Sequence, residues 1–508
     1  MARQPTSHRN RPSRQPASSA LAKKHPSRNT DTLLADIAAI NDAAYETGAA
    51  DKALAWCHIA ARRKLDDTRR CLLDFHTANA FICRHRETQG NGSGTWEHPD
   101  IENAIAHLRK AIANPAFPLL DELPRCRILT LLGNQYGYMG HFTEALACWN
   151  RALAIDSRFG MALGNRGKSI AEYAELPAMA PQKTAFLKIA CENLADATAD
   201  KARYYGDEQG KQYFLAEHEK TEMTLLSDDA ALPDVAPGKK NAKTGKDKPY
   251  RKWCAENTLC LNPYNDLGKG TAASGDLPEW TNTDAPGIVT PTARTLSHLY
   301  REYTAIRRLC HDAIHARALR GAGKKNAPGN PSSPPSPAAI QAIETVKLAC
   351  RAGWALLPKI ARLVNDHFGA RLPDGKYTLK TVWYTGGNPA EGLAAPFAES
   401  TNWPLRGLFW LSKSLPPERH LNTLEPDSIL WKTVATTLEN GSLRIIEHDG
   451  ATPNIVEGTL SRRQLQTCTL AIMRLARNAL VYLTLAIAEG TPASSGKHTP
   501  DRNDTIAP

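Results

Sequence analysis

Apolar residues and alanines recur at helical spacing from Asp31 onward, with few of the β-branched alternations that are typical of strands. Strand-like patterns are confined to two short segments, residues 376–384 and 443–447. A chain with the helical period almost throughout buries its apolar faces by packing helix on helix. The sequence therefore predicts an all-α protein.

One predicted helix pair, residues 129–157, carries a specific pattern of small and aromatic residues. Its first helix holds Gly133 and Tyr136, a short turn follows, and its second helix holds Ala145 and Trp149. The small residues let two antiparallel helices approach closely, and the aromatic side chains fill the space between neighbouring pairs. This spacing resembles the tetratricopeptide repeat.

Weaker copies of the pattern surround this pair and give four or five helix pairs in all. Gly167, for example, lies 34 residues after Gly133, although the spacing between other copies is irregular. The resemblance implies a helical solenoid over residues 29–226, and an amphipathic stretch at residues 207–226 is expected to cap it.

Two asparagines, Asn134 and Asn165, stand 31 residues apart on successive first helices. This spacing is similar to that of tetratricopeptide domains that clamp the carboxyl terminus of a peptide. Thr130 stands where such a clamp has a lysine, and Lys168 can substitute for it only in part. We therefore expect the repeats to bind a protein partner, with Asn134, Asn165 and Lys168 as candidate contacts. General polarity of the groove is the other interpretation.

A basic linker rich in Pro, Gly and Lys, residues 227–249, separates these repeats from a second helical part. A low-complexity segment, residues 321–337, is expected to form a long loop there. The helices of this second part are expected at residues 291–320, 338–368, 402–415, 427–439 and 461–488.

Three blocks of this second part together resemble the HEPN superfamily of helical domains, in the branch that follows tetratricopeptide repeats. The blocks are RKWCAENTLCLNPYNDLG at residues 251–268, WPLRGLFWLSK at 403–413 and LAIMRLARNALVYLTLAI at 470–487. The first block is typical of a helix that stops in a fixed turn, because Asn and Asp side chains bond nearby backbone. The resemblance implies a HEPN-like helical bundle over residues 250–490.

RNA-cutting members of this superfamily use an arginine and, four to six residues further along a helix, a histidine, which usually meet across a dimer. The arginine holds a phosphate and the histidine handles the proton of the attacking 2′-hydroxyl. In this branch the motif is expected to resemble RNxLEH, but residues 435–440 read ATTLEN. Ala435 cannot grip phosphate and Asn440 has no proton to exchange, so the motif is predicted to be degenerate. Glu439 and Asn440 are the candidate catalytic residues at this position.

Other pairs leave an active, metal-independent ribonuclease open as an alternative. Arg477 and Tyr482 repeat the opening of the motif with tyrosine in the place of histidine, on a helix whose apolar spacing favours packing. Arg308 and His315 are also candidate catalytic residues because they share a long predicted helix, although chance alone supplies about three such Arg/His matches.

His311 and His315 stand four residues apart on one helical face, as in two-histidine metal sites. No cysteine or carboxylate ligand set accompanies them, and Asp312 does not complete an HExxH motif. We therefore predict no metal. The sequence contains no glycine-rich phosphate loop and no Gly-x-Ser-x-Gly motif, so no cofactor is predicted either.

The net charge of +11 is concentrated in two segments, residues 1–28 and 239–252, with seven basic residues each. Their composition predicts flexible arms that can touch RNA without specificity, rather than a basic folded face. A second disordered tail is expected at residues 491–508. Eleven scattered cysteines without a CxxC pair predict the reducing cytoplasm, and no run of eighteen apolar residues or signal-like segment indicates a membrane span or export.

The leading hypothesis is a protein whose repeats bind a protein partner and whose HEPN-like domain binds RNA or a partner, in a stress or bacterial defence system. A homodimer through the HEPN-like domain is compatible with this hypothesis. The alternatives are the active ribonuclease described above and a scaffold that binds only proteins.

Overall fold

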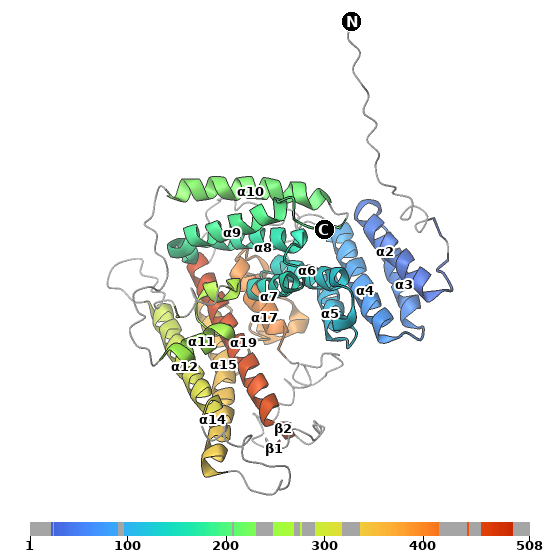
Figure 1. Ribbon diagram of the computed structural model, residues 1–508. Coiled ribbons are helices and arrows are strands. Elements are labelled where there is room, and N and C mark those ends of the chain that lie inside the picture. Colours follow the sequence, from blue (N-terminus) through green and yellow to red (C-terminus); the bar gives the residue numbers. More distant parts are fainter. Residues whose placement is uncertain are drawn as a thin grey trace. The chain divides into compact units, whose positions relative to one another are not determined.

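The computed structural model describes residues 22–23, 25–89, 96–205, 208–229, 247–268, 275–276, 290–316, 336–415, 444–446 and 459–490. Helices dominate these ranges (Figure 1), which confirms the all-α prediction. The strands that these ranges contain are two three-residue segments, β1 (Arg444–Ile446) and β2 (Thr459–Ser461), which pair in parallel. The strand expected at residues 443–447 is thereby confirmed.

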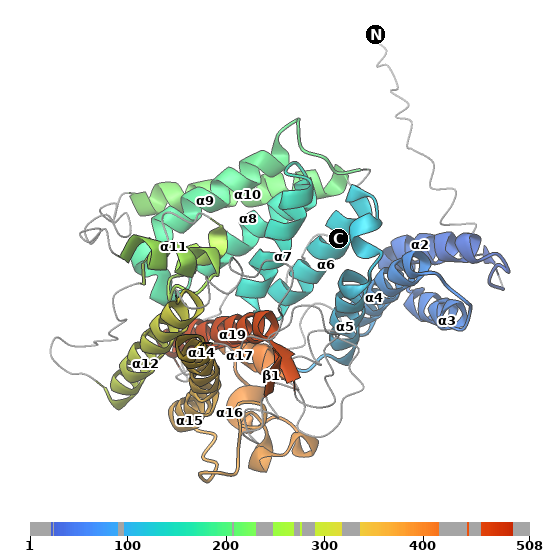
Figure 2. The same ribbon diagram turned by 60° about the horizontal axis from the view of Figure 1, so that its bottom comes forward.

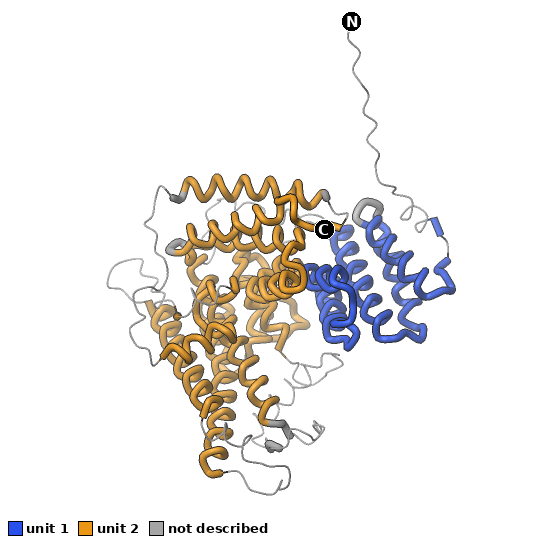
Figure 3. Tube along the Cα trace, in the orientation of Figure 1, with its two compact units in different colours: residues 1–93, 97–132, 501–504 blue, residues 94–96, 133–500, 505–508 orange. Residues whose placement is uncertain are grey.

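The chain forms two compact units, and the boundary between them falls within helix α6, at residues 132 and 133 (Figure 3). The first unit is made of residues 1–93, 97–132 and 501–504. Its helices are α2 (Thr30–Thr47), α3 (Ala50–Ala61), α4 (Asp67–Gln89), α5 (Pro99–Ala113), η1 (Phe117–Leu119) and the first part of α6 (Glu122–Tyr138).

The core of the first unit lies between α2, α3 and α4, whose apolar faces meet. Leu33 and Ile37 of α2 and Trp56 of α3 are buried in one cluster with Leu73 of α4. Asn29 caps α2 by accepting a hydrogen bond from the Thr32 backbone N–H, 3.0 Å away.

The second unit begins with a series of neighbouring antiparallel helices. They are the rest of α6, α7 (Phe142–Ile155), α8 (Gly160–Ala174), η2 (Pro177–Gln182), α9 (Lys183–Thr198) and α10 (Glu208–Asp229). Helices α8, α9 and α10 pack side by side, as Figure 2 also shows. The amphipathic stretch expected at residues 207–226 is therefore helical and covers α8 and α9, which is consistent with a solenoid.

Small residues set the spacing between these helices, as the repeat pattern predicted. A Cβ atom added at Gly133 would lie 2.6 Å from Nε1 of Trp149 on the neighbouring helix. At Gly164 it would lie 2.2 Å from the Phe214 ring of α10. Only glycine fits at either position without a shift of the backbone or of the aromatic ring.

The remainder of the second unit packs around one long C-terminal helix, α19 (Arg462–Glu489), which contacts α12, α14, α15 and α17. The elements before it are α11 (Lys248–Glu256), η4 (Pro263–Leu267), α12 (Pro291–Ile314), α14 (Pro337–Trp354), α15 (Leu356–Phe368), η5 (Thr385–Gly387), η6 (Pro389–Glu391), α16 (Ala395–Ala398) and α17 (Trp403–Lys413). Among the described helices, α19 is long and apolar enough to cross a membrane. However, 72% of its most apolar window is buried in the fold, as in the core helix of a soluble protein.

Two expectations for the second half are wrong. The single helix expected at residues 338–368 is two helices, because Pro358 lacks an N–H and its ring clashes with the carbonyl of Trp354, where α14 ends. Residues 376–384 form turns with one isolated bridge, between Tyr384 and Leu393, instead of a strand. The helix expected at residues 427–439 lies outside the described residues, as does most of the loop expected at 321–337.

Candidate functional site

The first candidate site surrounds Arg477, which projects from the middle of α19 and is 0% exposed. Its Nη1 and Nη2 atoms lie 2.8 Å from Oδ1 and Oδ2 of Asp266, respectively. Nε donates to the Cys260 carbonyl at 2.8 Å, and Nη2 also donates to the Asn262 carbonyl at 2.9 Å. All three guanidinium nitrogens are therefore engaged inside the fold.

The partners of Arg477 belong to the turn that follows α11. Asn262 caps η4 by accepting from the Tyr264 N–H, and Gly268 ends it with a φ of 73°. Arg166 of α8 holds the same turn from the other side, through a 2.8 Å bond from Nη2 to the Leu267 carbonyl. The first block of the sequence resemblance is thus a fixed turn clamped by two buried arginines.

Tyr482 stands one and a half turns beyond Arg477 on α19, and it is also buried. Its hydroxyl donates to Glu144 Oε2 at 3.1 Å and accepts the Thr143 backbone N–H at 2.9 Å. Asn478 donates to Glu144 Oε1 at 2.8 Å. The start of α7 thereby covers the face of α19 that carries the motif-like residues.

His141 completes this buried polar cluster. Its ring stacks on Tyr482 with centroids 5.8 Å apart, and its Nε2 lies 3.4 Å from Oε2 of Glu144. An imidazole is therefore present beside Arg477 and Tyr482. It comes from the turn between α6 and α7, and it is only 3% exposed.

The electrostatics of the cluster favour fixed protonation states. Burial raises the pKa of Tyr482 well above its ordinary value, and the nearby Glu144 carboxylate adds to the rise. Burial opposes the charge of Glu144, but His141 and hydrogen bonds from Thr143, Asn478 and Tyr482 outweigh it and hold the pKa of Glu144 low. For Arg477, the Asp266 carboxylate outweighs burial and raises the pKa. Tyr482 is consequently a neutral hydrogen-bond donor, and it is a poor proton acceptor at neutral pH.

Arg308 and His315 lie on the solvent-facing side of α12, next to α11. Arg308 is paired with Asp247, 2.9 Å from Nη1 to Oδ1, and with Asp312, 3.2 Å from Nε to Oδ2. Its side chain is 46% exposed and stacks over the Tyr250 ring at 4.5 Å. The structure therefore places the two candidate catalytic residues on one accessible face, where two carboxylates offset the charge of Arg308. Their catalytic role stays a prediction.

The three candidate partner-binding residues are largely buried within the second unit. Asn134 accepts a hydrogen bond from Trp149 Nε1 at 3.0 Å, and Asn165 is 3% exposed, with no hydrogen-bond partner for its Nδ2 atom among the described residues. Lys168 pairs with Glu172 at 3.2 Å and lies 5.8 Å from the centroid of the Tyr213 ring, under α10. Partner binding by these residues stays a prediction, and it requires access beneath α10.

Ala435, Glu439 and Asn440 lie outside the described residues, and the catalytic role of Glu439 and Asn440 stays a prediction. Within the described ranges, no group of three or more His, Cys, Asp or Glu side chains is arranged to hold a metal ion.

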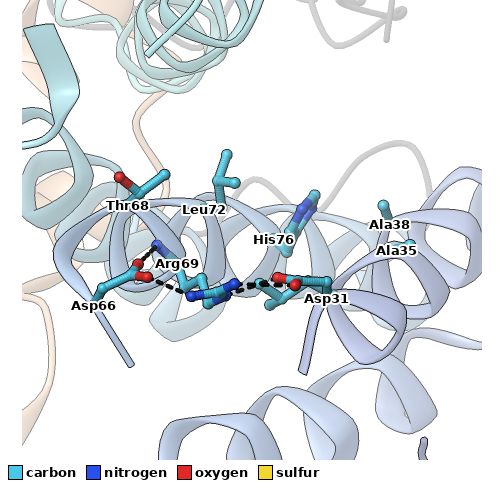
Figure 4. A pocket seen from close by; sticks show the side chains of 9 residues that line it. Asp31, Ala35, Ala38, Asp66, Thr68, Arg69, Leu72 and His76 are labelled. Atoms are coloured by element: carbon cyan, nitrogen blue, oxygen red, sulfur yellow. Dashed lines mark hydrogen bonds and ion pairs between the residues drawn. The ribbon is translucent and has the colours of Figure 1, made fainter. Parts of the chain in front are cut away.

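The first unit contains a shallow hollow of about 510 Å³ between α2 and α4 (Figure 4). Arg69 lies in the hollow and pairs with Asp31 and Asp66. His76 lies on the opposite side of Arg69 from Asp66. Apolar side chains, including Leu34 and Leu72, form much of its lining. Because two carboxylates accompany its one arginine, the hollow carries a net negative charge and offers no free cation to an anionic ligand.

Sequence reasoning missed Asp266, Glu144 and His141 as members of the Arg477 cluster. Asp266 and Glu144 are separated from Arg477 by 211 and 333 residues, and no local pattern links them. The sequence offered one signal, an arginine followed by asparagine on a helix with otherwise apolar spacing. A buried arginine requires a buried carboxylate, so this signal indicated that a carboxylate partner exists but not which residue supplies it.

A model of the LA2681-like HEPN family matches residues 288–490. The C-terminal part of the chain is therefore similar to a HEPN domain, from just before α12 to the end of α19, and the matched range contains Arg477 and Tyr482. No family match supports the tetratricopeptide repeats, which stay a prediction. Searches of curated proteins and of solved structures found no match.

Proposed function

We propose that this protein is a non-cleaving HEPN protein that binds RNA through the accessible face of α11 and α12. The observation that carries the non-cleaving part is the complete burial of Arg477, whose guanidinium is bound by Asp266 and backbone carbonyls. A guanidinium in this state cannot grip a phosphate unless α7 or the η4 turn moves away. In the motif-like copy on α19, Tyr482 takes the place of the proton-handling histidine, and its hydroxyl is committed to Glu144.

The RNA-binding part is supported by the residue types on the α11–α12 face. Arg308 and Lys252 present basic groups there, with side chains 46% and 73% exposed. Their ion pairs with Asp247, Asp312 and Glu256 lie at the surface, where such pairs contribute little, so a phosphate can compete with them. Tyr250 and Trp253 supply aromatic rings beside them. Basic groups that follow the backbone and aromatic rings that stack on bases are the usual components of sites for single-stranded RNA. The basic run at residues 239–252 ends within the sequence of α11.

The test uses the full chain with end-labelled transfer RNA and a structured RNA. Wild-type protein is expected to bind both RNAs and to cleave neither, and Tyr482→His is expected to confer no cleavage because Arg477 remains buried. Lys252→Ala and Arg308→Ala should each weaken binding and reduce the slope of log affinity against log salt by about one. Lys359→Ala, an exposed basic residue on α15, is the matched control and should bind like wild type.

Cleavage by wild-type protein that is lost in Arg308→Ala, His315→Ala, Glu439→Ala or Asn440→Ala would establish the ribonuclease alternative. Absence of RNA binding, together with protein partners that persist after nuclease treatment, would establish the scaffold alternative. In either case the proposal is overturned.

A further inference from the structure

Helix α10, the last of the series that starts with α6, carries apolar side chains on its outward face. Its inward face packs on α8 and α9 (Figure 1), and Phe214 and Thr221 on that face are 0% and 4% exposed. Leu215, Met223 and Leu226, in contrast, are 48%, 65% and 67% exposed. They are three of the nine exposed large apolar side chains among the described residues, and no other described helix holds as many.

These three side chains form one continuous stripe, which we call the α10 stripe. At about 100° per residue, Leu215, Met223 and Leu226 lie within about 80° of one another around the helix axis. Phe214 and Thr221 lie on roughly the opposite side of the axis. The α10 stripe spans residues 215–226 and is therefore about 17 Å long. A helix with apolar residues on opposite faces is expected to be covered on both.

The position of the α10 stripe at the end of a series of packed helices suggests what covers it. Each helix of such a series buries its apolar face against its neighbours, and the terminal helix normally has a polar outer face. An apolar outer face therefore leaves room for one more helix to pack. Anchors that follow one face of a helix over three turns are also the usual contacts between two helices from different chains.

The charged residues on the α10 stripe are acidic. Glu219 lies at its centre, between Leu215 and Met223, and Glu222 lies at its edge. Both glutamates are exposed, and neither forms an ion pair within the part of the chain that the structure describes. Lys220 lies about 100° around the helix from Glu219, outside the stripe.

This charge pattern selects the kind of occupant. Two copies of α10 packed stripe to stripe would bring the Glu219 and Glu222 carboxylates of both copies into one seam, where like charges repel. A helix with basic residues among its apolar ones places opposite charges in the same seam. The stripe therefore fits a basic partner better than a second copy of this chain.

We propose that the α10 stripe docks an amphipathic helix of a protein partner whose apolar face carries lysine or arginine near its centre. Leu215, Met223 and Leu226 contact the apolar side chains of that helix, and Glu219 and Glu222 pair with its basic groups. This docking is independent of RNA binding by α11 and α12.

The test measures the fluorescence anisotropy of two labelled synthetic peptides added to the full chain. Both peptides carry leucines at helical spacing, with lysines between the leucines in the basic peptide and glutamates there in the acidic peptide. The chain has a net charge of +11, so non-specific attraction favours the acidic peptide. Wild-type protein is expected instead to bind the basic peptide about tenfold more tightly than the acidic one.

Variants of the α10 stripe separate its charge from its apolar contacts. The double variant Glu219→Gln, Glu222→Gln should lose the preference for the basic peptide. The double variant Met223→Ser, Leu226→Ser should weaken binding of the basic peptide about tenfold. Leu348→Ser, a change to a leucine on α14 that is 55% exposed, is the matched control and should bind like wild type. Circular dichroism checks that each variant is folded.

Four results would contradict the proposal. The first is no binding of the basic peptide, and the second is a preference for it that survives in the double glutamine variant. The third is self-association of wild type in sedimentation velocity that is lost in Met223→Ser, Leu226→Ser, which would assign the α10 stripe to a second copy. The fourth is a crosslink from a photoreactive amino acid at position 223 to residues 239–246, which would assign it to the chain's own basic segment.

Discussion

The Arg477 guanidinium and the Asp266 carboxylate form a two-pronged ion pair, Nη1 to Oδ1 and Nη2 to Oδ2 at 2.8 Å each, with side chains 0% and 3% exposed. The pair joins α19 to the turn after α11, two segments 211 residues apart in sequence. A buried ion pair contributes little to stability compared with well-packed apolar residues in its place. Removing one partner, however, leaves the other charge buried without a partner. The residue that resembles a catalytic arginine is therefore part of the core of the second unit.

Removal of one partner of this pair is expected to destabilise the protein strongly. Asp266→Leu leaves the Arg477 charge buried, and Arg477→Met leaves the carboxylate buried, so each should lower the free energy of unfolding by about 3–5 kcal/mol. The double variant should lose less than the sum of the two single variants. Urea unfolding followed by far-ultraviolet circular dichroism measures these differences.

The exposed ion pairs of Arg308 provide the control for this experiment. Arg308→Ala should change the free energy of unfolding by less than about 1 kcal/mol, because solvent screens charges at the surface. Equal losses for Arg308→Ala and Arg477→Met would contradict the buried arrangement.

Removal of the Tyr482 hydroxyl separates its structural role from any role in catalysis. In Tyr482→Phe, Glu144 loses a donor and the Thr143 N–H loses its acceptor, both in a buried environment. We expect a loss of about 1–3 kcal/mol. Tyr377→Phe, whose hydroxyl makes an exposed 3.4 Å contact with Asp374, should change little, and thermal unfolding of both variants measures the difference.

The helices were predictable from sequence where the apolar period was strong and the ends carried clear signals. The helix expected from Pro291 begins there, and in the structure the Thr290 hydroxyl caps it by accepting from the Ala293 N–H. The break before Pro358 was missed because the alanine-rich pattern continues across it. The short segment at residues 376–384 has strand propensity, but its backbone is folded into turns. The structure of such a short segment depends on its packing more than on local propensity.

The site was less predictable than the fold. Helical periodicity placed Arg477 on a packing helix and anticipated its burial, but the cluster around it depends on contacts between residues hundreds of positions apart. The pairing of Glu144 with Asn478 and Tyr482 is such a contact. Periodicity also placed His311 and His315 on one face, whereas the hydrogen bonds that fix their tautomers required coordinates.

The close approach of α6 and α7 leads to a prediction for Gly133. A methyl group there would lie 2.6 Å from Trp149 Nε1 and would disturb the bond from that nitrogen to Asn134. Gly133→Ala should therefore cost about 1–3 kcal/mol, as expected for overpacking. At Gly137, one turn further, the same methyl would meet Trp149 at 3.3 Å, and the gain in helix propensity of about 1 kcal/mol offsets the tighter contact. We therefore expect Gly137→Ala to leave the stability nearly unchanged and Gly133→Ala to lower it. Thermal unfolding of the two variants measures the difference.

The last prediction concerns the pH dependence of the first unit. Burial lowers the pKa of His76, in the hollow between α2 and α4, to about 4. In the unfolded chain the same side chain has a pKa of about 6.5, so between these values the unfolded state binds more protons than the folded state. The stability of the first unit should consequently fall as pH falls from about 6.5 towards 4. At pH 5 the loss is expected to be about 1–2 kcal/mol, and partial exposure of the ring keeps it at the lower end.

Hydrogen exchange of peptides from α4, corrected for the intrinsic dependence of exchange on pH, measures this loss locally. Wild-type protein should show less protection of α4 at pH 5 than at pH 7.5. His76→Gln cannot take up the proton, so its protection should differ less between the two pH values, whatever its stability at pH 7.5. An equal change in wild type and His76→Gln would assign the pH dependence to other groups, whereas a smaller change in the variant would identify neutral, buried His76 as its source.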